Sequence, residues 1–149
     1  AGRLPRGQFH LESHPGAVWL GTSEGAVLDL PMQPEPQHHL RYMLLQIEHR
    51  RPILFNMVLD HLADEALSDR VERDPLLSWF AQLMDRRAPE QRVFTDQDLA
   101  SLRAQGFTQV VLHQQGWPRE RWELARSALT ASLGAPDFSV GEGWLAWDL

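Results

Sequence analysis

The chain has 149 residues and a formal net charge of −6, and 43% of its residues are hydrophobic. This length fits one domain, and the apolar content is that of a folded protein rather than a disordered one. The negative charge argues against nucleic acid as a partner, because nucleic-acid-binding domains carry an excess of basic side chains. There is no cysteine, so disulfides and thiolate metal sites are excluded.

The first 16 residues are polar and interrupted by prolines and glycines, which is typical of a linker. We therefore predict an irregular entry over residues 1–16 and a single domain over residues 17–149. No apolar run approaches the ~20 residues that a membrane-spanning helix needs. We expect the chain to be one domain of a longer polypeptide.

The first half of the domain predicts a strand, a helix and a second strand. Residues 26–30 are a short apolar run, and prolines follow it as a loop. The region 38–49 predicts a helix, and we expect it to pack through an apolar stripe with helical spacing. That stripe consists of Leu40, Met43, Leu44 and Ile47. Pro52 ends the helix, and the unbroken apolar run 53–58 predicts a strand covered on both faces.

The second half predicts mainly helices, followed by a hairpin. A polar helix is expected over residues 60–70, and a further helix after Asp74, which is placed to cap it. Thr95 and Asp98 resemble a capping box for a short helix that stops at Gly106. A strand over 107–113, a helix over 118–134 and an antiparallel pair over 138–140 and 144–147 complete the pattern.

Helices alternating with apolar strands favour parallel pairing with right-handed crossovers. The sequence therefore predicts an α/β fold. We expect a three-layer sandwich with a mostly parallel central sheet and a C-terminal antiparallel hairpin.

One group of candidate site residues lies on the predicted helix 38–49. Tyr42, Gln46 and His49 share a stripe nearly opposite the apolar one, so we expect them to point outward, near Arg41. Such a face is either solvated or a contact surface for a ligand head group or a neighbouring domain. Two arginines follow the helix, and with Arg41 they suggest an anionic ligand. They are Arg50 and Arg51.

A second group lies where apolar strands end. Asp29 is near the end of the first strand, His113 ends the third, and Asn56 lies late in the second. In an open α/β sheet these positions meet at the carboxyl edge, where an Asp–His pair suits acid–base chemistry or a purely structural contact.

Trp117, in a loop beside a glycine and a proline, is a candidate for membrane-interface or partner contact. The histidine spacings match no metal motif and no phosphate-binding glycine loop is present, so we predict neither a metal nor a cofactor.

Two blocks of sequence carry a resemblance to a known family. The first is residues 26–58, and the second is residues 99–113. The first holds the Asp-Leu-Pro strand end, the Tyr/Gln/His helix and an Arg-Pro pair that opens a strand. The second contributes a set of residues around the third predicted strand, namely Leu102, Gly106, Phe107, Val110, Val111 and His113. Their order resembles the soluble domain that follows the membrane helices of bacterial GT-C-type (dolichyl-phosphate-mannose mannosyltransferase-like) glycosyltransferases and their relatives.

The resemblance implies that the catalytic acidic residues lie in loops of a membrane portion outside this chain. It also implies a location on the extracytoplasmic (periplasmic) face of a bacterial inner membrane. The partners would be the membrane-embedded part of the same polypeptide and a lipid-linked sugar.

Three hypotheses follow from the sequence. The leading one is a non-catalytic extracytoplasmic domain of a polytopic membrane protein, a lipid-linked sugar transferase, that positions substrate or braces the membrane part. The second is a free-standing hydrolase or transferase that uses Asp29 and His113. The third is a binding module for an anionic ligand.

Overall fold

The computed structural model describes residues 13–32, 36–53, 69–85 and 87–149. Two helices and a strand come first in the chain, and the remaining strands are interleaved with three further helices. In chain order the elements are α1 (Pro15–Leu20), β1 (Ala26–Leu30), α2 (Pro36–His49), α4 (Pro75–Gln82), α5 (Asp96–Ala104), β2 (Phe107–His113), α6 (Arg119–Leu133), β3 (Phe138–Val140) and β4 (Trp144–Asp148). Residues 69–73 are also helical and lead directly to the start of α4.

The four strands form one mixed sheet in the order β1-β2-β4-β3. β1 and β2 run parallel, whereas β4 is antiparallel to both of its neighbours. The α/β class and the C-terminal hairpin are therefore confirmed, but the expectation of a mostly parallel sheet is wrong. The reason is the hairpin itself: β4 is buried at four of its five positions and takes the inner place beside β2, and the half-exposed β3 takes the edge.

Only part of the predicted second strand can be compared with the structure. Ile53 forms a parallel bridge to Val27, which places the chain beside β1 on the side away from β2. Residues 54–58 of that prediction, including Asn56, lie outside the described residues. So do residues 60–68 of the predicted polar helix.

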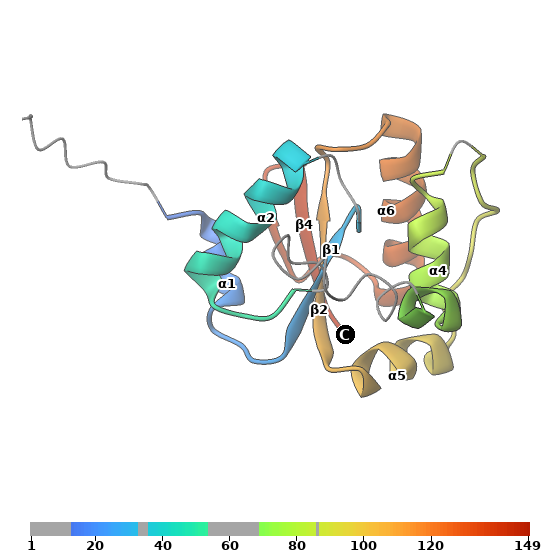
Figure 1. Cartoon of the computed structure of the whole chain (residues 1–149), viewed down its shortest axis with the longest axis horizontal. Helices are drawn as coiled ribbons and strands as arrows, with labels where there is room; N and C mark the ends of the chain where they lie inside the picture. Colours follow the sequence, from blue (N-terminus) through green and yellow to red (C-terminus); the bar gives the residue numbers. More distant parts are fainter. Residues whose placement is uncertain (1–12, 33–35, 54–68, 86) are drawn as a thin grey trace, which may run out of the picture.

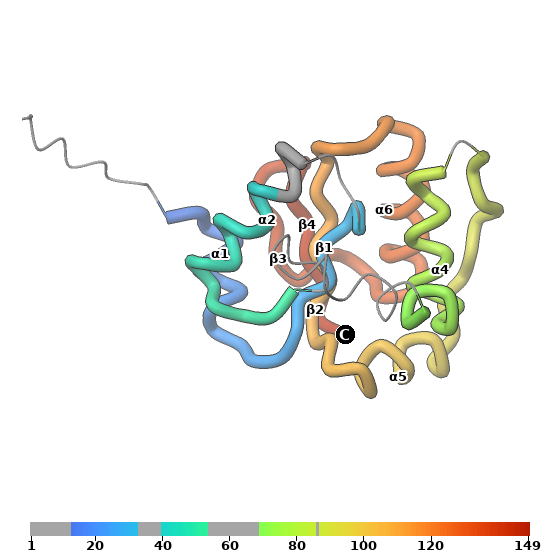
Figure 2. The backbone as a smooth tube through the Cα atoms, viewed as in Figure 1, coloured from blue at the N-terminus to red at the C-terminus, as the bar shows by residue number. Residues whose placement is uncertain are grey.

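Helices lie on both faces of the sheet, as Figure 1 shows: α1 and α2 on one side, α4 and α6 on the other. The tube view in Figure 2 follows the same path and shows the C-terminal hairpin beside the α1–α2 side of the molecule. The alternation of side chains along each strand therefore sends successive residues to two different environments.

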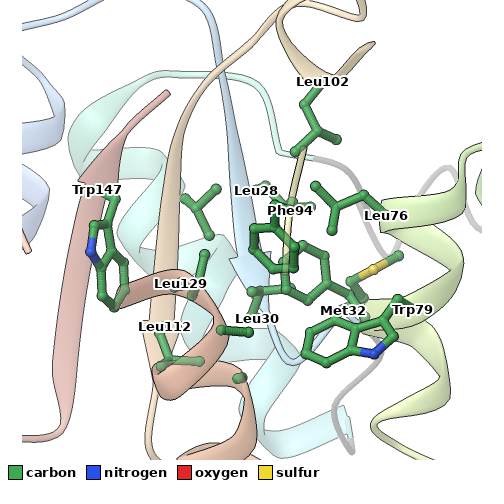
Figure 3. Close-up of a cluster of buried hydrophobic side chains, with 14 of the residues drawn as sticks. Leu28, Leu30, Met32, Leu76, Trp79, Phe94, Leu102, Leu112, Leu129 and Trp147 are labelled. Atoms are coloured by element: carbon green, nitrogen blue, oxygen red, sulfur yellow. The ribbon is translucent and has the colours of Figure 1, made fainter. Parts of the chain in front are cut away.

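The face under α4, α5 and α6 carries the main apolar core. The strands contribute buried leucine, valine and tryptophan side chains to it, and the helices cover them with aromatic and aliphatic ones (Figure 3). The strand members are Leu28, Leu30, Phe107, Val110, Leu112, Leu145 and Trp147. This cluster is the larger of the two and provides most of the apolar burial that stabilises the fold.

Local capping residues place the helices that cover this core. The Asp74 carboxylate accepts hydrogen bonds from the backbone N–H groups of Leu76 and Leu77, at 2.9 Å each, so α4 begins as predicted. Thr95 and Asp98 make both hydrogen bonds of a capping box at the start of α5. Gly106 follows α5 with φ of 97°, a conformation that favours glycine, and turns the chain into β2.

Candidate functional site

The helix α2 faces the sheet with the opposite side from the one predicted. Tyr42 and His49 are each 4% exposed, and Leu45 is buried between them on the same stripe. Leu40, Leu44 and Ile47 are 52%, 58% and 73% exposed. The two stripes are opposite one another as expected, but the expectation that the apolar one is buried and the Tyr/His one accessible is wrong.

The physical reason lies in the sheet surface beneath α2. Asp29 and His113 point toward this helix, and buried polar groups need hydrogen-bond partners that leucine side chains do not have. Tyr42 donates its hydroxyl hydrogen to the Pro31 carbonyl at 3.0 Å, and its ring packs on His113 with centroids 4.4 Å apart. An aromatic stripe with polar tips fits a polar sheet face better than an aliphatic one.

Arg51 is buried, and its guanidinium is used inside the fold rather than presented to a ligand. It donates to the carbonyls of Leu20, Glu24 and Gly25 at distances of 2.8 to 3.1 Å. It also donates to the Gln109 side chain, which in turn donates to Asp148 at 2.7 Å. Arg51 therefore joins the end of α1 and the following turn to β2, which is a structural role.

His49 is likewise part of this internal network. Its Nδ1 accepts a hydrogen bond from the Arg51 backbone N–H at 3.0 Å. Burial lowers the pKa of His49, and the Arg51 charge lowers it further, against the opposing effect of the Asp29 and Glu48 carboxylates. The neutral imidazole is thus the form that this position favours.

Asp29 and His113 meet at the carboxyl end of the parallel pair β1–β2. Asp29 Oδ1 and His113 Nε2 are 2.7 Å apart, and both side chains are buried. An ionised carboxylate only accepts hydrogen bonds, so the contact orients the imidazole with Nε2–H toward Asp29 and Nδ1 away from it. A histidine oriented in this way can act as a proton acceptor, provided that a substrate reaches it.

Two buried polar atoms near this pair have no hydrogen-bond partner among the described residues. They are Asp29 Oδ2 and the indole nitrogen of Trp144. The ring of Trp144 is T-shaped to His113, with centroids 6.2 Å apart, and tilted on His14 at 5.5 Å. An unpaired buried donor and an unpaired buried acceptor are rare in proteins, and they mark this region as a candidate for ligand contact.

A cavity of about 180 Å³ opens beside the pair. Its lining includes His113, Tyr42 and Trp144, together with His14 and Arg41. The Arg41 guanidinium donates to the Gln115 side chain, which is on the loop after β2. The cavity therefore lies where ligands bind in open α/β sheets, beyond the carboxyl ends of parallel strands.

Two titratable side chains of the cavity, His14 and Tyr42, have shifted pKa values. The pKa of His14 is lowered by burial first, and also by the positive charges of Arg41 and His113, whereas Glu48 raises it. Burial raises the pKa of the Tyr42 phenol well above its usual value, and Asp29 adds to this effect. Tyr42 is therefore a neutral donor at every physiological pH and not a proton acceptor.

The remaining predicted contact residues differ in exposure. Arg41 is exposed, and Gln46 and Trp117 are half-buried. Trp117 donates its indole hydrogen to the His113 carbonyl at 2.8 Å, so it holds the loop that follows β2 against the sheet. This contact gives Trp117 a part in shaping the site.

Two ring-bearing residues of the cavity, His14 and Trp144, are not among the site residues predicted from the sequence. His14 falls in the predicted linker, yet it caps α1: its Nδ1 accepts from the Gly16 N–H at 3.1 Å, and Pro15 occupies the first helical position. The His-Pro pair is the pattern that points to this helix start. Trp144 carries no such pattern, because only the pairing of β4 with β2 brings it beside His113.

Among the described residues, no group of His, Asp or Glu side chains is arranged to hold a metal ion, and no helix is long and apolar enough to cross a bilayer. Comparison of the chain with protein-family models, with curated proteins and with solved structures finds no match.

Proposed function

We propose that the chain is a non-catalytic extracytoplasmic domain of a polytopic membrane protein, a lipid-linked sugar transferase, and that it docks on the membrane-embedded part. The observation that carries this proposal is the exposed apolar stripe of α2, formed by Leu40, Leu44 and Ile47. A contiguous exposed apolar surface is typical of an interaction site. The resemblance of residues 26–58 and 99–113 to the domain that follows GT-C membrane helices supplies the identity of the partner.

We infer a three-layer arrangement as the frame for this docking. α1 and α2 cover one face of the sheet and α4 and α6 the other (Figure 1). Two separate clusters of buried apolar residues occupy these two faces. The stripe then lies on the outer surface of an outer layer, where a second protein surface has access to it. Val18 of the neighbouring helix α1 is also exposed.

The proposal is tested first on the gene and then on the intact protein. The reading frame should encode several apolar segments of about 20 residues outside this domain. In the intact protein, Leu44→Glu and Ile47→Glu should release the domain from the membrane part and reduce turnover, measured by limited proteolysis and by sugar transfer. Val93→Glu is the matched control, because Val93 is equally exposed but lies far from α2 in the chain.

Two results would contradict the docking function. One is a reading frame without apolar spans. The other is an intact protein in which Leu44→Glu and Val93→Glu behave alike, which would make the stripe an ordinary solvated surface.

An enzyme that uses Asp29 and His113 is the second candidate, and the 2.7 Å contact between them favours it. Such a pair can position a base for hydrolysis or group transfer. The purified domain should be assayed against ester, phosphoester and activated-sugar substrates, beside an Asp29→Asn/His113→Ala double variant. Turnover that disappears in the double variant would establish this candidate and defeat the non-catalytic function.

A further inference from the structure

The cavity beside His113 is separate from the exposed stripe of α2 that is proposed to dock on the membrane part. Its walls come from five parts of the fold: the start of α1, the first turns of α2, the end of β2 with the loop after it, the end of β3 and the start of β4. The outer stripe of α2 faces away from it, because Tyr42 on the opposite stripe lines the cavity. A role for this cavity is therefore independent of the proposed docking.

The polar groups that line the cavity favour an anion. Among the described residues, the lining holds one arginine, Arg41, and two imidazoles, from His14 and His113, and no carboxylate. Of the nearby acidic groups, Asp29 pairs through Oδ1 with His113 while its Oδ2 has no partner among the described residues, and Glu48 accepts from the His14 backbone N–H at 3.2 Å. An arginine is suited to carboxylate and phosphate groups because its planar guanidinium offers several donors.

The wall of the cavity also contains the ring of Trp144. The Trp144 indole N–H is buried and has no partner among the described residues, although its ring lines the cavity at 4% exposure. Tryptophan normally satisfies this donor when it is buried. Arg41 is therefore the side chain of the lining that supplies a charged donor to an oxyanion, and Trp144 supplies an aromatic wall.

The size and the walls of the cavity limit the rest of the ligand. A volume of about 180 Å³ is slightly larger than a cavity known to hold benzene, which is about 150 Å³. The rings of Tyr42 and Trp144, with Val140, supply apolar wall area. There is room for a single six-membered ring with a small head group.

We propose that this cavity binds a small organic oxyanion, in which a carboxylate or phosphate group is carried on one ring. Arg41 donates to the oxyanion, and the ring lies between Tyr42 and Trp144. Asp29 keeps the His113 imidazole in position as the floor of the site. Binding requires no chemical step, so it is separate from the enzymatic candidate.

The test is a titration of the ¹⁵N-labelled 149-residue chain, followed at the assigned indole signal of Trp144. The probes are phenyl phosphate, benzoate, inorganic phosphate and the neutral benzyl alcohol. We expect the two ring anions to shift the Trp144 signal saturably, with dissociation constants below about 1 mM, and benzyl alcohol to leave it unchanged. Arg41→Gln should weaken binding about tenfold or more, which is the loss of one charge-assisted hydrogen bond.

Arg103→Gln is the matched control, because Arg103 is an exposed arginine on α5, remote from the cavity in the fold. It removes the same charge and should leave the affinity unchanged. An unshifted Trp144 signal, or equal weakening by Arg41→Gln and Arg103→Gln, would overturn the site. Inorganic phosphate binding as tightly as phenyl phosphate would overturn the part of the proposal that concerns the ring.

Discussion

The two faces of the sheet are built from different chemistry. On the face under α4 and α6, the strands present Leu28, Leu112, Trp147 and their neighbours, all buried and all apolar. On the face under α1 and α2, β1 and β2 present Asp29, Gln109 and His113 between apolar residues. Both faces are largely buried, yet the first is held by burial of apolar area and the second by directional contacts.

This difference separates stability from specificity. Apolar burial is roughly proportional to area and tolerates exchange of one hydrophobic side chain for another of similar volume. A buried polar network tolerates little, because removal of one member leaves another unsatisfied. Substitutions on the apolar face should therefore lower stability through lost packing, and substitutions on the polar face through hydrogen-bonding groups left unsatisfied.

The largest effect is expected on the apolar face. Phe80→Ala should lower the free energy of unfolding by about 3–5 kcal/mol, because Phe80 is 1% exposed and its removal leaves a cavity. Leu112→Met, which nearly conserves volume, should cost less than about 1.5 kcal/mol. Urea unfolding followed by circular dichroism measures both values. Similar losses for the two variants would show that this face does not behave as a close-packed apolar core.

The next largest effect concerns Arg51 on the polar face. Arg51→Met keeps most of the volume but leaves the carbonyls around it and Gln109 without their donor, at a cost of about 1–3 kcal/mol. Arg50→Met is the control, since Arg50 is the exposed neighbour and should change stability by less than about 0.5 kcal/mol. Equal denaturation midpoints for the two variants would rule out the structural role of Arg51.

The dependence of stability on pH should come partly from His49. Its pKa is lowered in the folded state, so the unfolded chain binds the proton more tightly. Its contribution to stability is therefore fully present above the unfolded pKa of about 6.5, and is lost as the pH falls from there through the folded pKa. His14, whose pKa is also lowered, acts in the same direction.

The His49 contribution is isolated by substitution. His49→Gln should flatten the fall in stability below pH 6.5, measured as the free energy of unfolding in a series of buffers. A variant profile that is parallel to the original one over this range would mean that the proton affinity of His49 is the same in both states.

The smallest effect should be that of an exposed leucine. Leu44→Ala should change the free energy of unfolding of the domain by less than about 0.5 kcal/mol, because the side chain is 58% exposed. Leu45→Ala, one residue along the same helix, should cost about 2–5 kcal/mol as a buried leucine. Thermal unfolding of the two variants compares the two faces of α2 directly. A large loss of stability for Leu44→Ala would contradict the observed orientation of the helix.

Local patterns were enough to predict most of the elements. Asp74 before Pro75, and Thr95 with Asp98, predicted two helix starts because a cap needs only groups within three or four residues. The apolar run 107–113 predicted β2 for the same local reason. The pairing partners of β2 were not predictable in this way, because the pattern of a strand does not say which neighbour it will take.

The sequence by itself determined that region 38–49 is a helix with two opposite stripes, that it is followed by a break at Pro52, and that Asp29 and His113 lie near strand ends. Only the tertiary structure decided which stripe of α2 is buried. Periodicity is the same for both stripes, and the choice depended on the polar sheet face, whose Asp29–His113 contact joins residues 84 positions apart. The formation of the cavity likewise depends on the tertiary structure, because Trp144 reaches His113 only through the pairing of β4 with β2.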